Sequence, residues 1–289
     1  MNYRLHTLVE SRFALDGGAM FGIIPKPLWE RTNPADASNR IAMAARCLVL
    51  EDGAGDLTLV DAGMGTKWSA RDRDVYRVEQ GDDDITAGLR AMGLDPGRVR
   101  NVVLTHLHFD HVGGLTAHDA AGSPIPVFPH AVHWVQRENW VWAHHPTSRD
   151  AGSYRTENFR MLGTADCPQL ELLDGDTEIL PGIRVLPQFG HTPGMQLVEF
   201  TTSNQRCVFV ADLFPTVGHI QPVWVMGYDL HPLRAVAEKE ALLRRASDED
   251  LVFAFEHDPT TEFGRPALDA RGRWTVTPWS LPPNDGTPG

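Results

Sequence analysis

Residues 106–111 read His-Leu-His-Phe-Asp-His, and no other segment constrains the fold and chemistry of this chain as strongly. Four of these six side chains can bind a metal ion. Histidine occurs 13 times in 289 residues, so the chance of His-x-His-x-Asp-His at a given position is on the order of one in a hundred thousand. A single histidine would more often be an ordinary surface residue, but the cluster predicts a metal site.

The local geometry of this segment leaves room for two ions. In an extended chain His106 and His108 project to the same side, because side chains alternate along a strand. Asp110 and His111 fall where the chain turns, and the Gly-Gly pair at 113–114 allows the backbone to approach closely. Nitrogen and oxygen ligands suit zinc, manganese, iron and cobalt alike, so zinc is a default choice among divalent ions.

Composition narrows the class of protein. The formal net charge of −12 opposes binding to nucleic acid. The three cysteines have no paired spacing, so neither a disulfide framework nor a thiolate zinc site is expected. No apolar run approaches the roughly 18 residues of a membrane span, and no signal-like start is present. We expect one domain over residues 1–289, located in the cytoplasm, with a small-molecule substrate and no nucleic-acid or membrane partner.

The pattern of apolar residues and breakers predicts a mixed α/β fold. Short strands are expected at residues 44–50, 57–60, 102–104, 184–187, 196–200 and 208–210. Helices are expected at residues 84–92, 129–142 and 232–246. The tail at 278–289 is rich in proline and glycine, so it is expected to be extended.

Five segments in this order resemble the metallo-β-lactamase superfamily over roughly residues 40–260. They are Leu59-Val-Asp61-Ala-Gly63, His106-Leu-His108-Phe-Asp110-His111, Gly190-His191-Thr-Pro-Gly194, Ala211-Asp212 and His257. The resemblance implies an αββα sandwich, in which two central β-sheets are flanked by helices. It also implies an enzyme, a metal-dependent hydrolase that uses a hydroxide bridging two ions.

The resemblance further implies a ligand set. One ion would be held by His106, His108 and His191, the other by Asp110, His111 and His257, and Asp212 would bridge the two. Asp110 would also be the catalytic residue that accepts or transfers a proton. Asp61 would lie beneath the metals and orient ligands by hydrogen bonds.

The last ligand has competitors nearby in the sequence. These are Asp258, His219 and His231. His257 is preferred because it ends the apolar, strand-like run at residues 251–256.

Residues 15–29 and 39–41 look similar to the group that contains acyl-homoserine lactone lactonases and methyl parathion hydrolase. This similarity points to a lactone, ester or phosphotriester substrate, with a substrate-loop segment at about residues 12–40. Met20, Phe21 and Ile23 are candidates for the pocket, with plain core packing as the alternative.

Two positions depart from the lactonases. Met195 stands where many relatives have histidine, and Pro215 stands where the lactonases have tyrosine. Tyr228 is the candidate for supplying the phenol instead.

Other functions of the same fold remain open. A glyoxalase-II-like thioester hydrolase shares the ligand set, a mononuclear iron oxygenase needs only one ion's ligands, and a non-catalytic binding protein needs none. The stretch at 130–145, rich in Trp and His, is a candidate lid or homodimer contact, although core packing explains it equally well.

Overall fold

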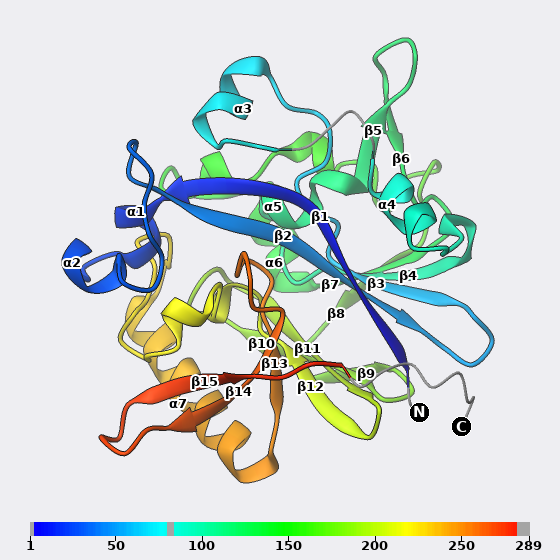
Figure 1. Ribbon diagram of the computed structural model, residues 1–289. Helices are drawn as coiled ribbons and strands as arrows, with labels where there is room; N and C mark the ends of the chain where they lie inside the picture. The colour runs from blue at the N-terminus through cyan, green and yellow to red at the C-terminus, as the bar shows by residue number, and fades with distance from the viewer. Residues whose placement is uncertain (1–2, 80–83, 282–289) are drawn as a thin grey trace.

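Two β-sheets that face each other form the centre of the computed structural model, which describes residues 3–79 and 84–281 (Figure 1). Within these residues the first sheet has six strands in the order β1-β2-β3-β4-β7-β8. Their bounds are Arg4–Asp16, Arg40–Glu51, Leu57–Val60, Val99–Val103, Val132–Gln136 and Leu170–Leu173.

The second sheet is built from the C-terminal half of the chain, in the order β15-β14-β13-β12-β11-β10-β9. From β9 to β15 the bounds are Thr177–Leu180, Ile183–Gln188, Met195–Thr202, Gln205–Phe209, Val252–Ala254, Phe263–Leu268 and Trp274–Pro278. A separate small pair joins β5 (Thr116–His118) to β6 (Pro124–Pro126).

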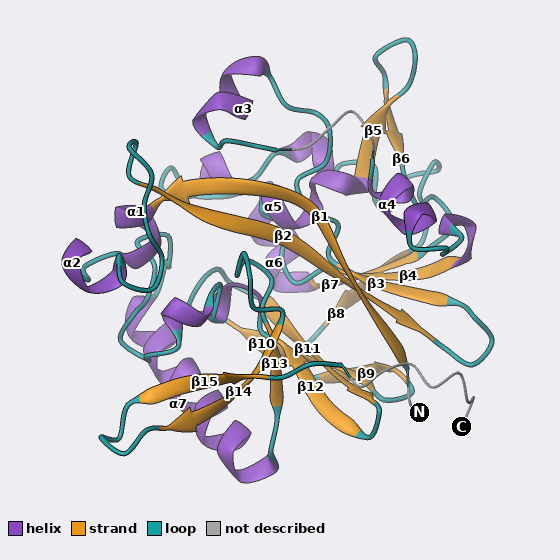
Figure 2. Cartoon of the chain, in the orientation of Figure 1, coloured by secondary structure: helices purple, strands orange, loops and turns teal. Residues whose placement is uncertain are grey.

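Helices cover the outer sides of the two sheets (Figure 2). Leu89 of α4 lies in the apolar core on the outside of the first sheet, and Leu243 of α7 packs with residues of the second. The helices are α1 (Gly17–Phe21), α2 (Lys26–Trp29), α3 (Ala70–Val75), α4 (Ile85–Ala91), α5 (Phe109–Val112), α6 (Arg137–His144) and α7 (Pro232–Glu249). The predicted αββα sandwich is confirmed.

The central strands are apolar without alternation because both of their faces are covered. In β2, Leu48 and Leu50 enter the core between the sheets, whereas Cys47 and Val49 enter the core beneath the helices. All four side chains are fully buried. A continuous apolar run is typical of a strand covered on both faces, which explains the pattern at residues 44–50.

The prediction of a helix over residues 129–142 is wrong in its first half. Val132–Gln136 is strand β7, which pairs in parallel with both β4 and β8, and α6 begins only at Arg137. Valine and tryptophan suit a central strand, and pairing along both edges outweighs the local helical spacing. The other two expected helices correspond to α4 and α7.

Two expected segments lie near the ends of the chain. The stretch at 12–40, expected to be a substrate loop, starts inside β1, which stays paired with β2 as far as Asp16, and then carries α1 and α2. The tail expected at 278–289 begins with the last residue of β15, and the Trp279 amide donates to the Phe263 carbonyl. Residues 282–289 of that tail lie outside the described residues.

The loop after β3 packs directly on the turn that carries Asp110 and His111. The Ala62 amide donates to the His111 carbonyl, and the Gly113 amide donates to the Gly63 carbonyl, both at 2.7 Å. A Cβ atom on Gly113 would lie 2.0 Å from the Met64 carbonyl oxygen. The expected close approach of backbone at residues 113–114 is therefore present, and only glycine fits there.

Replacing Gly113 by alanine should destabilise the fold, because backbone would have to move on both sides of the contact. We expect a loss of about 1–3 kcal/mol or more in the free energy of unfolding, measured by chemical denaturation. Gly53→Ala is the matched control, since a Cβ atom there meets nothing within 4 Å. Equal stability of the two variants would contradict the steric argument.

Candidate metal centre

The seven predicted ligand residues come from four places in the chain and meet at one end of the two sheets. The histidine cluster follows β4 and continues into α5, and His191 lies in the loop between β10 and β11. Asp212 lies in a 3₁₀ turn (Ala211–Leu213) after β12, and His257 follows β13. All seven side chains are buried.

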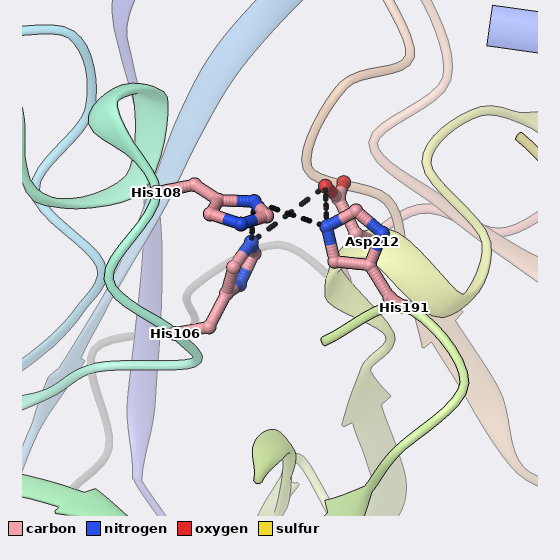
Figure 3. A group of neighbouring side chains, drawn as sticks. All are labelled: His106, His108, His191 and Asp212. Atoms are coloured by element: carbon pink, nitrogen blue, oxygen red, sulfur yellow. Dashed lines mark hydrogen bonds and ion pairs between the residues drawn. The ribbon is translucent and has the colours of Figure 1, made fainter. Parts of the chain in front are cut away.

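His106, His108, His191 and Asp212 form the first group (Figure 3). His108 Nδ1 lies 3.0 Å from His106 Nε2 and 3.1 Å from His191 Nε2. Asp212 Oδ2 lies 3.1 Å from His191 Nε2 and 3.7 Å from His106 Nε2. Three ring nitrogens and one carboxylate oxygen thus face a common point.

Asp110, His111 and His257 form the second group, directly beside the first. The Nε2 atoms of His111 and His257 are 3.3 Å apart. Asp110 lies 3.8 Å from His111 Nε2 through Oδ1 and 3.7 Å from His257 Nε2 through Oδ2. Asp212 Oδ1 lies 3.1 Å from His257 Nε2 and Asp212 Oδ2 lies 3.6 Å from His111 Nε2, so Asp212 lies against both groups.

The outer nitrogen of each inward-facing imidazole also has a contact, except in His108, whose Nε2 has no hydrogen-bond partner among the described residues. His191 Nδ1 lies 2.9 Å from Asp229 Oδ1, and His257 Nδ1 lies 2.8 Å from the Ala44 carbonyl oxygen. His106 Nδ1 lies 3.1 Å from Thr105 Oγ1. A contact of this kind fixes the orientation of a ring, and an acceptor also fixes which nitrogen carries the proton.

Two buried carboxylates meet the outer nitrogen of His111. Asp61 Oδ2 and Glu256 Oε2 each lie 3.0 Å from His111 Nδ1. Asp61 also accepts hydrogen bonds from the amide and hydroxyl of Thr105. Burial and the nearby Asp61 charge raise the pKa of Glu256 to about 8, although His111 opposes the shift.

Sequence reasoning missed Asp229 and Glu256. Asp229 lies in an irregular loop with no motif around it, so nothing in the sequence pairs it with His191. Glu256 directly precedes His257, and a glutamate at the end of an apolar run was the one available signal.

The donor atoms fit a divalent metal ion. Burial holds the pKa values of His106 and His108 well below the usual range, so these rings are neutral and present lone pairs inward. For His191 and His257 burial acts in the same direction, but the Asp212 carboxylate outweighs it and both pKa values rise to about 9. The carboxylates thus favour positive charge where the lone pairs converge, and a cation supplies it.

A cavity of about 260 Å³ opens onto both groups. Met20 and Tyr228, two of the four expected pocket residues, line it. Phe21 does not, because it is fully buried and stacks on Trp29 and His219. Ile23 is 91% exposed and is not a lining residue of this cavity.

The structure places the competing candidates outside both groups. Asp258 accepts hydrogen bonds from three backbone amides, His219 contacts the Met20 carbonyl and Thr216, and His231 is exposed at the start of α7. In the stretch at 130–145, Trp140 and Trp142 pack against the apolar core, so core packing accounts for them.

Comparison with known proteins identifies the family. The model of the metallo-beta-lactamase superfamily matches residues 42–257. The chain belongs to this superfamily. An N-acyl homoserine lactonase, AttM of Agrobacterium fabrum, is 27% identical over 248 residues, which is 82% of each chain. Together with the superfamily match, this similarity to a lactonase indicates that the protein is a hydrolase.

Solved structures agree on the fold. A probable metal-dependent hydrolase from Staphylococcus aureus is 28% identical, covers 97% of this chain and 99% of its own, and superposes with a TM-score of 0.84. The dizinc quorum-quenching lactonase AidC is 20% identical, covers 97% of this chain and 98% of its own, and superposes with a TM-score of 0.76. Within residues 3–79 and 84–281, no helix is long and apolar enough to cross a membrane.

Removing the carboxylate of Asp229 should weaken metal binding at the first group, because His191 loses the partner that orients its ring. We expect Asp229→Ala to lower metal affinity roughly 10- to 100-fold, measured by competition with a chromophoric chelator. Asp229→Asn keeps an oxygen acceptor, so its metal affinity should fall by less. Wild-type affinity in Asp229→Ala would show that His191 needs no such partner.

Lys239 supports the loop that carries Asp229. Its side chain is 1% exposed, and Nζ donates to the carbonyls of His219 and Trp224 at 2.7 Å each. Burial lowers the pKa of Lys239 to about 7, and the charge of Asp229 opposes that shift only partly. A buried lysine thus joins α7 to the loop at residues 219–230.

The low pKa of Lys239 should make stability depend on pH. Between pH 7 and about 10.4 the unfolded chain binds this proton and the folded chain does not, so stability should rise with pH across this window. Lys239→Met lacks the proton, and the wild type should therefore gain stability relative to it from pH 7 to pH 10. Denaturation of both metal-free proteins tests this, and parallel pH profiles would contradict it.

Proposed function

We propose that the protein is a binuclear metallohydrolase that cleaves a small lactone, ester or phosphotriester. The observation that supports this most directly is the position of Asp212. Its Oδ2 atom lies 3.1 Å from His191 of the first group and 3.6 Å from His111 of the second, and its Oδ1 atom lies 3.1 Å from His257 of the second. A carboxylate in this position suits a bridge between two ions.

Two divalent ions, with zinc as our choice, would acidify a water molecule and polarise the scissile carbonyl or phosphoryl oxygen. Six side chains besides Asp212 would hold them, namely His106, His108 and His191 for one and Asp110, His111 and His257 for the other. Asp110 also lines the cavity, so its carboxylate can accept a proton near the reacting group and transfer it to the leaving group.

The cavity supports a small and partly apolar substrate. Its walls include Met20, Met43 and Met226, and such flexible side chains adapt to an acyl or aryl group. Burial raises the pKa of Tyr228 to about 12, so its hydroxyl stays protonated and can donate a hydrogen bond to the substrate. The lactonase relatives favour a lactone, although Pro215 replaces their tyrosine.

The alternative functions of this fold predict different experimental results. A mononuclear oxygenase would need only one group of ligands, whereas both groups are assembled here. A glyoxalase-II-like enzyme would share both groups and differ in cleaving thioesters. A non-catalytic protein would bind metal without turnover.

The metal content of the purified protein tests the proposal first. Elemental analysis should find two ions per chain in the wild type and about one in His257→Ala, with loss of hydrolysis, because the second group then keeps only two ligands besides Asp212. His145→Ala removes an exposed histidine and serves as the matched control. One ion in the wild type would overturn the binuclear assignment.

A substrate panel then tests the reaction class. It should contain lactones of different chain length, aryl esters, a phosphotriester and a thioester, all assayed with fully metallated protein. We expect turnover of at least one lactone or ester. Cleavage of the thioester alone would favour the glyoxalase-II-like function, and no hydrolysis with two bound ions would contradict the substrate class.

A further inference from the structure

Arg149 spans the mouth of the cavity between two loops. It lies in the segment after α6, and its Nη2 donates to the Gly227 carbonyl at 2.6 Å. Gly227 belongs to the loop that also carries Tyr228 and Asp229. The guanidinium is therefore held in place by one of its nitrogens, and its Nη1 and Nε have no hydrogen-bond partner among the described residues.

Arg149 also lies where two cavities meet. The cavity of about 260 Å³ and a smaller one of about 120 Å³ share the lining residues His108, Arg149, Ser153, His191 and Tyr228. The smaller cavity therefore opens on the His108 and His191 side of the metal centre. Together the two cavities form one site with two compartments.

The compartments differ in character. The larger one has a wall of apolar side chains, including those of Leu15, Met43 and Phe109. The smaller one adds Asp150, Gly227 and Leu230. The Asp150 carboxylate is already engaged by Trp142 Nε1 and Thr147 Oγ1, so its charge is partly satisfied.

Apart from the histidines, Arg149 is the only basic side chain that lines either compartment within the described residues. Ser153 lies beside it in both linings, and its hydroxyl has no hydrogen-bond partner among those residues. A guanidinium with free N–H groups and a neighbouring hydroxyl suit a carboxylate, whose two oxygens accept parallel hydrogen bonds. Because the net charge of −12 repels anions, a local cation is needed to bind one here.

We propose that Arg149, assisted by Ser153, binds a carboxylate on the substrate. This inference rests on the proposed function and narrows its substrate class. The substrate is then an ester or lactone with an apolar group on one side of the scissile bond and a carboxylate on the other. The apolar group occupies the methionine-lined compartment, and the carboxylate lies on the His108 and His191 side.

A pair of matched esters tests this. Phenyl hexanoate and 3-carboxyphenyl hexanoate share the acyl group, and the meta carboxylate changes the leaving group little. The wild type should prefer the carboxylated ester. In Arg149→Met the ratio of kcat/KM for the carboxylated ester to kcat/KM for the plain ester should fall roughly 10- to 100-fold, mainly through KM. The ratio for Arg149→Lys should lie between those of the wild type and Arg149→Met.

The control variant is Arg160→Met, which removes the same charge from an exposed arginine that lines neither cavity. It should keep the wild-type ratio. If Arg149 only joined the two loops, Arg149→Met would slow both esters by the same factor. That result, or no preference in the wild type, would overturn the proposal.

Binding measured without turnover separates this proposal from the proposed function. Calorimetric titration with 3-hydroxybenzoate, the product of the second ester, should give a Kd at least roughly tenfold weaker for Arg149→Met than for the wild type. If neither these esters nor any compound of the substrate panel is hydrolysed, the proposed function fails, while this difference in Kd still supports a carboxylate site. Equal Kd values would overturn the carboxylate site whether or not the esters react.

Discussion

The carboxylate of Asp212 is buried among four imidazoles, and the rest of the site is arranged around the charge it carries. In isolation such a buried anion would be costly, because burial opposes ionisation. The surrounding histidines reverse that effect and hold the pKa of Asp212 well below its usual range. Its two oxygens contact histidines of both groups, so the negative charge is shared between the groups. The fold must therefore bring both histidine groups to one carboxylate. The positions of the loops at this end of the sheets follow from that requirement.

At His257 the fold meets this requirement through backbone contacts. The His257 amide donates to the Pro215 carbonyl, and its ring contacts the Ala44 carbonyl, so β2 of the first sheet fixes a residue that follows a strand of the second. Arg46 strengthens the same junction, since its buried guanidinium donates to the Phe255 carbonyl at 2.5 Å. Carbonyl groups at the ends of packed strands move little. They therefore hold the His257 ring in a fixed orientation. The rings of His106, His111 and His191 instead have buried side-chain partners at their outer nitrogens.

A residue's role could be predicted from the sequence where it depends on nearby residues, and not where it depends on distant ones. The cluster at 106–111 is contiguous, and its chemistry and spacing alone indicate a metal site. The resemblance added His191, Asp212 and His257, which the structure brings beside the cluster, because each follows a strand or turn with a visible pattern. Asp229 could not be found in this way, since its role depends on a loop folding back over 38 residues onto His191. The error at β7 has the same origin. Its pairing with strands on both sides is non-local, and helical spacing in a short aromatic stretch carries no information about it. Phe21 and Ile23 show a further limit, because apolar character does not distinguish a pocket wall from a core or an exposed position.

One loop, residues 219–230, connects metal geometry with substrate binding. It carries Asp229, which orients His191, and Met226 and Tyr228, which line the cavity. Lys239 holds it from α7, and His219, stacked on Phe21, holds it against α1. The Asp229 carboxylate also accepts the Met226 amide, so one side chain fixes both a ligand ring and a wall residue. A change that shifted the cavity wall would therefore also disturb His191. Arg149, in the segment after α6, lines the same cavity and donates to the Gly227 carbonyl, so it also contacts the loop that ties the cavity wall to His191.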